Sequence, residues 1–212
     1  MSDSPLNPVP TTRARVVLLS GPSGSGKSSL AERSGLPVLQ LDDFYKDGDD
    51  PTLPLLPDGA VDWDSPLAWH RDQAVAAIRS LYETGRADVP VYSIPDNGRI
   101  DTRVLDLAGA PAFIAEGIFA AEITAECAAE GLLGDALCLR NGALTTAWRR
   151  LRRDVREGRK SLPVLVRRGW RLMRAERSIV ERQVALGSYP CAGAEAARRI
   201  TAAAWATEYS AV

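Results

Sequence analysis

Eight consecutive residues near the start of the chain have the types and the spacing needed to bind a polyphosphate. The segment Gly21-Pro22-Ser23-Gly24-Ser25-Gly26-Lys27-Ser28 fits the pattern G-x-x-x-x-G-K-[ST] at every fixed position. Glycines let the backbone curl so that successive N–H groups point at one anion. Lys27 can then reach the β- and γ-phosphates, and Ser28 can offer its hydroxyl to Mg²⁺. The residues that we predict to bind the triphosphate are Gly21, Ser23, Gly24, Ser25, Gly26, Lys27, Ser28 and Ser29.

The sequence on both sides of this loop fits a strand before it and a helix after it. Residues 16–19 are a short apolar, β-branched run, which is typical of a buried parallel strand. Residues 27–33 fit a helix that ends at Gly35, and its positive N-terminal end would point at the same anion. The alternative interpretation, a glycine- and serine-rich surface turn, would not require a strand before it and a helix after it. We therefore predict a site for a nucleoside triphosphate with Mg²⁺.

Acidic residues follow two other predicted strands. Asp42 and Asp43 come directly after one short apolar run, and Glu116 follows another. Ligands of open parallel α/β sheets lie beyond the carboxyl ends of the strands, so these carboxylates should lie near the phosphate loop. We predict that Asp42 accepts a proton from an attacking hydroxyl or helps to bind Mg²⁺, with a capped, solvated turn as the structural alternative. Ser28, Asp42 and Glu116 form the predicted Mg²⁺ site, because Mg²⁺ prefers hard oxygen ligands.

A strong helix start lies at Ser65-Pro66, where serine suits the cap and proline the first helical position. Apolar residues then recur at helical spacing, so we predict one helix that ends at Gly85. Asp64 stands just outside this start, where it could complement the helix dipole or bind a polar substrate. His70, the only histidine, falls inside the predicted helix, where a surface or interface role is expected rather than a catalytic triad.

A mixed aromatic and polar segment lies between Tyr92 and Arg99. The residues before it fit a short strand, and the segment itself fits an irregular loop. An aromatic ring, an amide and an arginine in one loop suit a small polar ligand with a flat ring. The Asp-Asn-Gly sequence inside it is also ordinary turn chemistry, so both interpretations stay open.

A strongly basic segment extends from Arg149 to Arg182. It holds thirteen arginines or lysines against four acidic residues, which is a net charge of +9. Such a run is usually a solvated helix face or a nucleic-acid-binding stripe. In a phosphoryl-transfer enzyme, arginines on a mobile lid instead neutralise the charge on the transferring group. Gly158 and Pro163 interrupt the run where a lid would bend, so we predict a helical lid at about residues 149–170.

Length and composition bound the class of protein. With 212 residues, of which 45% are hydrophobic and 25% charged, the chain fits one globular domain. The net charge of −1 gives no general attraction to nucleic acid or anionic membranes, and no apolar run is long enough to span a bilayer. Three scattered cysteines fit free thiols in a reducing cytoplasm. We predict a cytoplasmic protein without nucleic-acid or membrane partners, with residues 1–14 as a disordered lead-in and residues 15–212 as one domain.

Several of these motifs, in the same order, resemble the uridine kinase (uridine–cytidine kinase) family of P-loop kinases. The resemblance covers roughly residues 15–200 and implies an α/β fold, with a P-loop NTPase-type parallel sheet flanked by helices and an Arg-rich helical lid. The segments that carry it are the loop at 21–29, Leu41-Asp42-Asp43-Phe44-Tyr45-Lys46-Asp47, Trp63-Asp64-Ser65-Pro66, Ala115-Glu116-Gly117-Ile118, and Arg149-Arg150-Leu151-Arg152-Arg153-Asp154 with Gly158-Arg159.

The resemblance also implies roles for single residues. Asp42 corresponds to the family's catalytic base, and Asp64 to the carboxylate that holds the ribose hydroxyls. Tyr92 and Arg99 fall on the family's nucleoside loop. The catalytic residues so implied are Lys27, Asp42, Arg150 and Arg153, and the substrate-binding residues are Asp64, Tyr92, Arg99, Arg150 and Arg159.

The function that the resemblance implies is phosphorylation of the 5′-hydroxyl of uridine or cytidine by ATP with Mg²⁺. Ile94 and Asn97 stand where family members usually have an aromatic residue and a histidine. A kinase of another nucleoside, pantothenate or a phosphosugar therefore stays open. A GTPase-like switch would need an Asn-Lys-x-Asp motif, which the sequence lacks, and a nucleic-acid-binding ATPase would use the basic segment. The expected partners are ATP and a small-molecule acceptor, and a homo-oligomer is compatible with the sequence.

Overall fold

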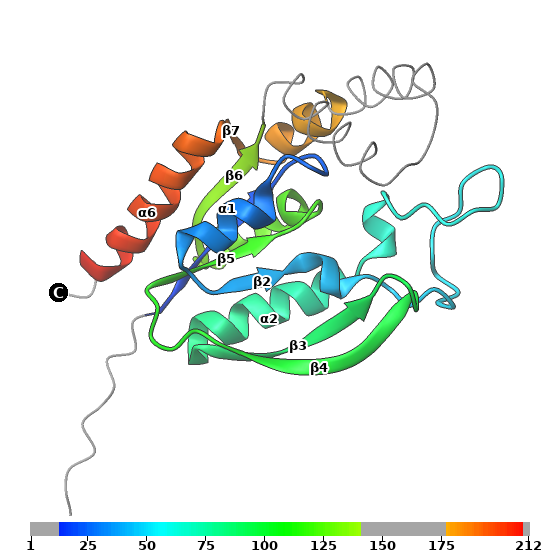
Figure 1. Ribbon diagram of the computed structural model, residues 1–212, viewed down its shortest axis with the longest axis horizontal. Coiled ribbons are helices and arrows are strands. Elements are labelled where there is room, and N and C mark those ends of the chain that lie inside the picture. The colour runs from blue at the N-terminus through cyan, green and yellow to red at the C-terminus, as the bar shows by residue number, and fades with distance from the viewer. Residues whose placement is uncertain (1–12, 141–176, 210–212) are drawn as a thin grey trace, which may run out of the picture.

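A five-stranded parallel sheet forms the centre of the protein (Figure 1). The computed structural model describes residues 13–140 and 177–209. In this part of the chain the strand order is β2-β5-β1-β6-β7, and every neighbouring pair is parallel. The strands are β1 (Arg15–Ser20), β2 (Val38–Gln40), β5 (Ala112–Glu116), β6 (Leu133–Leu139) and β7 (Tyr189–Cys191).

Helices cover both faces of the sheet, as β1 shows residue by residue. Val16 and Leu18 pack in the core that contains α2, whereas Val17 and Leu19 pack in the core that contains α1 and α6. Successive side chains of a strand point to opposite faces, so a strand covered on both sides is apolar throughout. This arrangement confirms the predicted α/β fold with a parallel sheet between helices. The helices are α1 (Lys27–Ser34), α2 (Arg71–Thr84), α3 (Thr124–Ala129) and α6 (Gly193–Tyr209), with short 3-10 helices η1 (Leu41–Phe44), η2 (Pro66–Ala68) and η3 (Ala120–Ile123).

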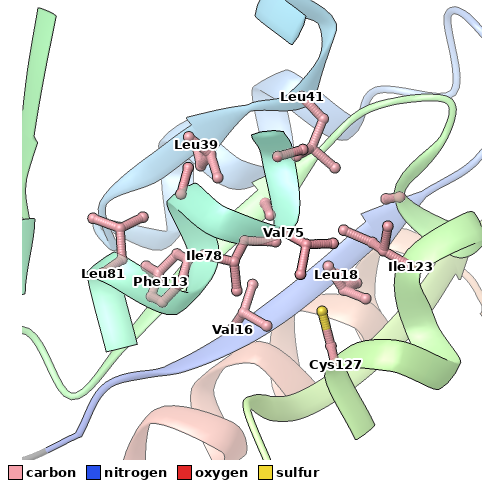
Figure 2. Packing of buried hydrophobic residues seen from close by; sticks show 14 of the residues in the cluster. Val16, Leu18, Leu39, Leu41, Val75, Ile78, Leu81, Phe113, Ile123 and Cys127 are labelled. Atoms are coloured by element: carbon pink, nitrogen blue, oxygen red, sulfur yellow. The ribbon is translucent and has the colours of Figure 1, made fainter. Parts of the chain in front are cut away.

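The larger hydrophobic core lies between the sheet and α2 (Figure 2). From α2 come Val75, Ile78 and Leu81, each at most 1% exposed, and from the sheet come Leu18 and Phe113. Burying an apolar side chain of this size stabilises the fold by roughly 1.5–3 kcal/mol. The core therefore holds α2 firmly against β1 and β5, the two strands that lead into the predicted site.

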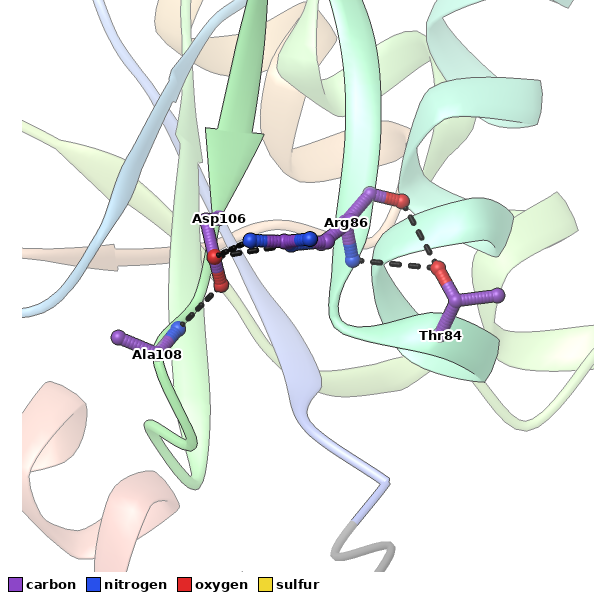
Figure 3. Close-up of polar contacts among 4 residues, drawn as sticks. All are labelled: Thr84, Arg86, Asp106 and Ala108. Carbon is purple, nitrogen blue, oxygen red and sulfur yellow. Dashed lines mark hydrogen bonds and ion pairs between the residues drawn. The ribbon is translucent and has the colours of Figure 1, made fainter.

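An antiparallel hairpin of β3 (Arg86–Ser93) and β4 (Gly98–Asp106) forms a separate two-stranded sheet. The sequence predicted only a short strand and an irregular loop here, and that prediction was wrong for β4. Most of β4 is exposed, so it lacks the apolar run by which a buried strand is recognised. At the hairpin base, Arg86 Nε donates to Asp106 Oδ2 at 2.8 Å, and Thr84 Oγ1 bonds to the Arg86 backbone (Figure 3).

The helix predicted to start at Ser65 is interrupted before α2. Ser65 does cap a helical turn, as predicted, because its Oγ accepts the Leu67 N–H at 3.3 Å. The chain then turns at Trp69, whose buried indole Nε1–H donates to the Leu41 carbonyl oxygen at 3.0 Å. A buried indole N–H needs such a partner, so the tertiary contact overrides the local helix signal. His70 consequently precedes α2 instead of lying inside a helix.

Two predictions from the sequence fall largely outside the described residues. The lid at about residues 149–170 lies wholly outside them, and of the lead-in at residues 1–14 only residues 13 and 14 are described. Within the described ranges, no helix is both long enough and apolar enough to cross a membrane.

Candidate active site

The phosphate loop joins β1 to α1, and its glycines shape it. Gly21, Gly24 and Gly26 have φ angles of +143°, +79° and +92°, which side chains rarely adopt. A Cβ atom at Gly21 would lie 2.5 Å from the carbonyl oxygen of Leu139 at the end of β6. Backbone geometry therefore requires these glycines, in addition to the demands of a phosphate ligand.

Lys27 begins α1 with a side chain that is only 7% exposed. Its Nζ donates to the carbonyl oxygens of Gly21 at 2.9 Å and Pro22 at 3.3 Å, so the ammonium lies over the loop. A cavity of about 410 Å³ opens at the same place, and Lys27, Ser28 and Ser29 line it. One cavity is thus lined by the predicted cation of Lys27, the predicted Mg²⁺-binding hydroxyl of Ser28 and the first turn of α1.

Asp42 reaches the same edge of the sheet from β2. It lies in η1, directly after β2, and the pairing of β2 with β5 places Gln40 beside Glu116. The turn after β5 passes very close to Asp42: a Cβ atom added at Gly117 would lie 2.9 Å from Asp42 Oδ1. The backbone N–H of Ile118 donates to the Asp42 carboxylate. Two neighbouring strands together therefore hold this side chain.

The charges around Asp42 oppose one another. Burial raises the pKa of its carboxyl above the ordinary value, and the nearby carboxylate of Glu116 raises that pKa further. The ammonium of Lys27 and the N–H of Ile118 lower the same pKa in part. The structure therefore brings Lys27, Asp42 and Glu116, from three separate segments of the chain, within range of one another's charge.

The oxygen donors at this edge fit a magnesium ion. Asp42 and Glu116 offer carboxylate oxygens, and Ser28, exposed at the start of α1, offers a hydroxyl. Hard oxygen ligands of this kind are those that Mg²⁺ prefers, and Mg²⁺ usually keeps water and phosphate ligands as well. Among residues 13–140 and 177–209, no group of three acidic, histidine or cysteine side chains could hold a metal alone.

Asp43 faces the hairpin instead of the phosphate loop. Its Oδ1 accepts the backbone N–H of Tyr92 at 3.3 Å, and its Oδ2 lies 4.0 Å from Nη2 of Arg103. Burial raises the pKa of this carboxyl, while the Tyr92 N–H and Arg103 lower it. The two adjacent acids therefore do different things: Asp42 faces the loop, and Asp43 ties η1 to the hairpin.

Aromatic rings surround Tyr45, just after η1. The centroid of its ring lies 5.8 Å from that of Trp63, 6.0 Å from that of Tyr92 and 5.8 Å from that of Phe119. Its hydroxyl donates to the Trp63 carbonyl oxygen at 3.2 Å. These four residues form an aromatic wall, contributed by the segments after β2 and β5, the segment before η2 and the end of β3.

The aromatic wall lies beside two predicted site carboxylates. Burial raises the pKa of Tyr45, and the charges of Asp42 and Asp64 raise it further. Both carboxylates must therefore lie near this phenol, although 22 residues separate them in the sequence. The structure in this way groups Asp64 and Tyr92, two predicted substrate residues, with Asp42 around Tyr45.

Arg99 is placed differently from the other predicted substrate residues. It pairs with Tyr92 across the hairpin, and its backbone N–H donates to Asp47 Oδ1 at 2.8 Å. Arg99 also lines a cavity of about 720 Å³ between α2 and the hairpin, and neither Tyr92 nor Asp42 lines that cavity. Arg99 therefore pairs with Tyr92 of the aromatic wall through its backbone, but it lines a separate cavity beside α2. Its role in binding an acceptor stays a prediction.

Three predicted arginines cannot be placed in this site. Arg150, Arg153 and Arg159 lie outside the described residues, and their roles as lid residues stay predictions.

Sequence reasoning missed three members of the aromatic wall. Tyr45 and Trp63 stand close to Asp42 and Asp64 in the sequence, so an aromatic residue near each candidate acid was a usable signal. Phe119 gave no such signal, because it contacts Tyr45 only through the fold, from the segment after β5.

Comparisons with known proteins agree with these motifs. No protein-family model matches the sequence. The uridine kinase of Schizosaccharomyces pombe is 33% identical over 126 residues, which is 56% of this chain but 28% of the yeast protein. The uridine kinase of Bacillus thuringiensis is 26% identical over 163 residues, or 74% of each chain. The chain thus spans less than a third of the yeast protein, and both matches support the resemblance that the motifs indicate.

A solved structure shows the same architecture. A protein from Silicibacter sp. TM1040, provisionally named as a fructose transport system kinase, superposes with a TM-score of 0.56 at 20% identity. The match covers 84% of this chain and 88% of that one. The two proteins share a parallel sheet flanked by helices. At this level of identity the likeness concerns the fold alone.

Proposed function

We propose that this chain is an ATP-dependent phosphotransferase that phosphorylates a hydroxyl group of a small molecule. The observation that carries the proposal is the approach of Lys27 to Asp42, close enough for the ammonium to lower the pKa of the carboxyl. A cation for the β- and γ-phosphates and a carboxylate for the hydroxyl proton are what direct phosphoryl transfer requires. The similar proteins described above all carry the name of a kinase.

In the proposed reaction the loop and Lys27 hold the triphosphate. Asp42 accepts the proton of the acceptor hydroxyl while the acceptor oxygen bonds to the γ-phosphorus, and ADP leaves. In the protein without bound metal, the raised pKa of Asp42 makes its carboxylate a stronger base than an exposed aspartate, which favours general-base catalysis. Ser28, Glu116 and Asp42, the last directly or through a water molecule, would hold Mg²⁺, which would supply positive charge to the phosphate oxygens. We assign Arg150 and Arg153 to the same task from the lid, and Arg159 to binding of the substrate.

For the acceptor we propose a pyrimidine nucleoside, phosphorylated at its 5′-hydroxyl. A flat base suits the aromatic wall, and sugar hydroxyls suit the carboxylate of Asp64, which is exposed near Tyr45. The two relatives with the name uridine kinase point in the same direction. The three described cysteines are buried free thiols, which supports the cytoplasm as the compartment of the reaction.

The residues at the tip of the hairpin are compatible with a second class of acceptor. Ile94 is 83% exposed, and Asn97 directs its backbone carbonyl to the Gly48 N–H at 2.7 Å. Neither residue provides an aromatic ring or an imidazole that would read a base. A kinase of another hydroxyl-bearing metabolite, such as another nucleoside, pantothenate or a phosphosugar, is therefore the alternative.

The test is a panel of acceptors incubated with ATP and Mg²⁺, with release of ADP as the readout. We expect uridine or cytidine to give the highest kcat/KM and the product to be the 5′-monophosphate. Turnover of pantothenate or a phosphosugar alone would keep the phosphotransferase and replace the acceptor. ATP consumption that no hydroxyl acceptor stimulates would contradict the proposed function.

The assignment of Asp64 can be tested separately from the chemistry. Asp64→Ala should raise the KM of the acceptor about tenfold or more and leave the KM of ATP nearly unchanged, because only the sugar hydroxyls lose a partner. Steady-state kinetics with each substrate varied in turn measures both constants. Equal effects on the two substrates would return Asp64 to a structural role at the start of η2.

A further inference from the structure

One exposed face of α1 continues the phosphate cavity beyond the predicted loop. Gly26, Ser29 and Arg33 follow one another at intervals of three and four residues, so they lie along the same side of the helix. The cavity of about 410 Å³ at the loop is lined by Gly24, Gly26, Lys27, Ser28, Ser29 and Arg33. All of these residues except Arg33 belong to the loop or to the first turn of α1. Arg33 comes from the last turn and extends the cavity along the helix.

The guanidinium of Arg33 is turned back toward the loop. Its Nη1 donates to Ser29 Oγ, one turn nearer the start of the helix. Among the described residues, no carboxylate forms an ion pair with Arg33, whereas Arg79 and Arg199 each bind a carboxylate through two nitrogens at 2.8–2.9 Å. A basic residue in a last turn also complements the helix dipole. The bond to Ser29, however, directs this charge toward the cavity.

A bound triphosphate would bring negative charge to this point. The loop N–H groups cradle the α- and β-phosphates, and Lys27 reaches the β- and γ-phosphates. Ser29 and Arg33 lie farther along α1 than Lys27 and line the same cavity, so we take this part of the cavity to receive the α-phosphate. A planar guanidinium forms two parallel hydrogen bonds with a phosphate more readily than a lysine ammonium does.

We propose that Arg33 is a binding residue for the donor nucleotide and that its guanidinium contacts the α-phosphate. This inference rests on the proposed function, because it takes the ligand of the loop to be ATP. Arg33 then adds a second cation to the donor site, one helical turn beyond the sequence motif. Lys27 then binds the β- and γ-phosphates, and Arg33 binds the α-phosphate. Ser29 orients the guanidinium of Arg33 through their hydrogen bond.

The experiment measures binding of ATP, ADP and tripolyphosphate by calorimetry, without an acceptor. Arg33→Ala should weaken all three ligands about tenfold, which corresponds to about 1.4 kcal/mol, and Arg33→Lys should recover part of the loss. Arg15→Ala is the charge-matched control, because Arg15 is exposed at the first residue of β1, the opposite end of that strand from the loop. Arg15→Ala should bind all three ligands as the parent does.

The possible outcomes separate this inference from the proposed function. Failure of the parent protein to bind ATP would contradict the proposed function itself. Tight binding by the parent together with unchanged binding by Arg33→Ala would overturn only the role of Arg33. Weaker binding of ATP and ADP with unchanged binding of tripolyphosphate would place Arg33 on the nucleoside and overturn the α-phosphate contact. In kinetics we expect the KM of ATP to rise while the KM of the acceptor stays constant.

Discussion

At the scale of single residues, Asp42 shows how the fold creates reactivity at the expense of stability. Its carboxyl is buried beside Glu116, and both effects raise its pKa, whereas Lys27 and the Ile118 N–H compensate only in part. A buried carboxylate without full compensation opposes folding when it is ionised. Perturbed groups gather at functional sites, and the pKa values of Asp42 and Asp43 are both raised. The choice of Asp42 as the base rests on its neighbours, because Lys27 and Glu116 act on Asp42 whereas Asp43 bonds to the hairpin.

Asp42→Asn keeps the shape of the side chain and removes its charge. We expect kcat to fall by roughly 10²–10⁴, because general-base catalysis contributes about that factor, while binding of ATP is retained. Asp43→Asn is the matched control: it should be far milder, because Asp43 binds the hairpin and not the reacting hydroxyl. Turnover and ATP binding of both variants test this assignment. An inactive Asp43→Asn beside a nearly normal Asp42→Asn would shift the assignment by one residue.

The raised pKa of Asp42 also predicts a pH-dependent difference in stability. Because the pKa in the folded state lies above that of the unfolded chain, the group favours folding below the unfolded pKa, and this contribution is lost as the pH rises through the folded pKa. Without nucleotide and Mg²⁺, Asp42→Asn should therefore be more stable than the parent at neutral pH. Urea unfolding at a series of pH values should show this advantage shrinking as the pH falls. An advantage that is constant with pH would contradict the raised pKa.

At the scale of elements, the turn after β5 is the part that positions the candidate base. Gly117 allows this turn to pass Asp42 closely, since a Cβ atom there would lie 2.9 Å from both Asp42 Oδ1 and Leu41 Cβ. The next residue, Ile118, then donates its N–H to the carboxylate. Glycine at position 117 lets two strand ends pack closely. The glycines of the phosphate loop instead allow backbone angles with positive φ.

Gly117→Ala should disturb both the site and the fold. The new methyl group must displace Asp42 or Leu41, so we expect kcat to fall by roughly 10–10² and the free energy of unfolding to fall by about 1–3 kcal/mol. Gly193→Ala is the control, because no atom lies within 4 Å of a Cβ there and the change should stay within about 0.5 kcal/mol. Kinetics and urea unfolding of both variants provide the comparison. Normal turnover by Gly117→Ala would show that the turn can relax without moving Asp42.

At the scale of the whole molecule, the parallel sheet assembles the site from distant segments. β1 leads into the phosphate loop, β2 into Asp42 and β5 into Glu116, and the pairing of β5 with both other strands sets their ends level. The hairpin and the segment before η2 then add Tyr92 and Asp64 from outside the sheet. A ligand that bridges these segments should therefore stabilise the entire fold.

Mg²⁺ with ATP should raise the melting temperature of the parent protein but not that of Lys27→Ala. At a free ligand concentration of 100 times Kd the stabilisation is about 2.7 kcal/mol, or roughly 5–10 °C for a protein of this size. Lys27→Ala should itself still fold, because the substitution adds no bulk and the bonds of the ammonium to the carbonyls of Gly21 and Pro22 lie within the phosphate loop. Thermal shift assays of both proteins, with turnover measured alongside, make the test. An equal shift in the variant would contradict the role of Lys27.

Local patterns in the sequence were enough to predict the position of several helices and strands. The strand before the loop, the end of α1 at Gly35 and the end of the longer helix at Gly85 all appear where they were predicted. These elements depend on nearest neighbours: apolar runs, helical spacing and glycines that accept a left-handed end. The interruption at Trp69 was not predictable in this way, because its cause is a bond to Leu41, 28 residues earlier in the chain.

The sequence alone determined the phosphate loop and the acids at the strand ends, because loop geometry and parallel-strand ends impose fixed residue types at fixed spacings. Only the tertiary structure decided that Asp43 bonds to the hairpin, that Arg99 lines a different cavity, and that three aromatic residues surround Tyr45. These features depend on strand register and on contacts between segments far apart in the chain. Such contacts leave no local periodicity or motif from which they could be read.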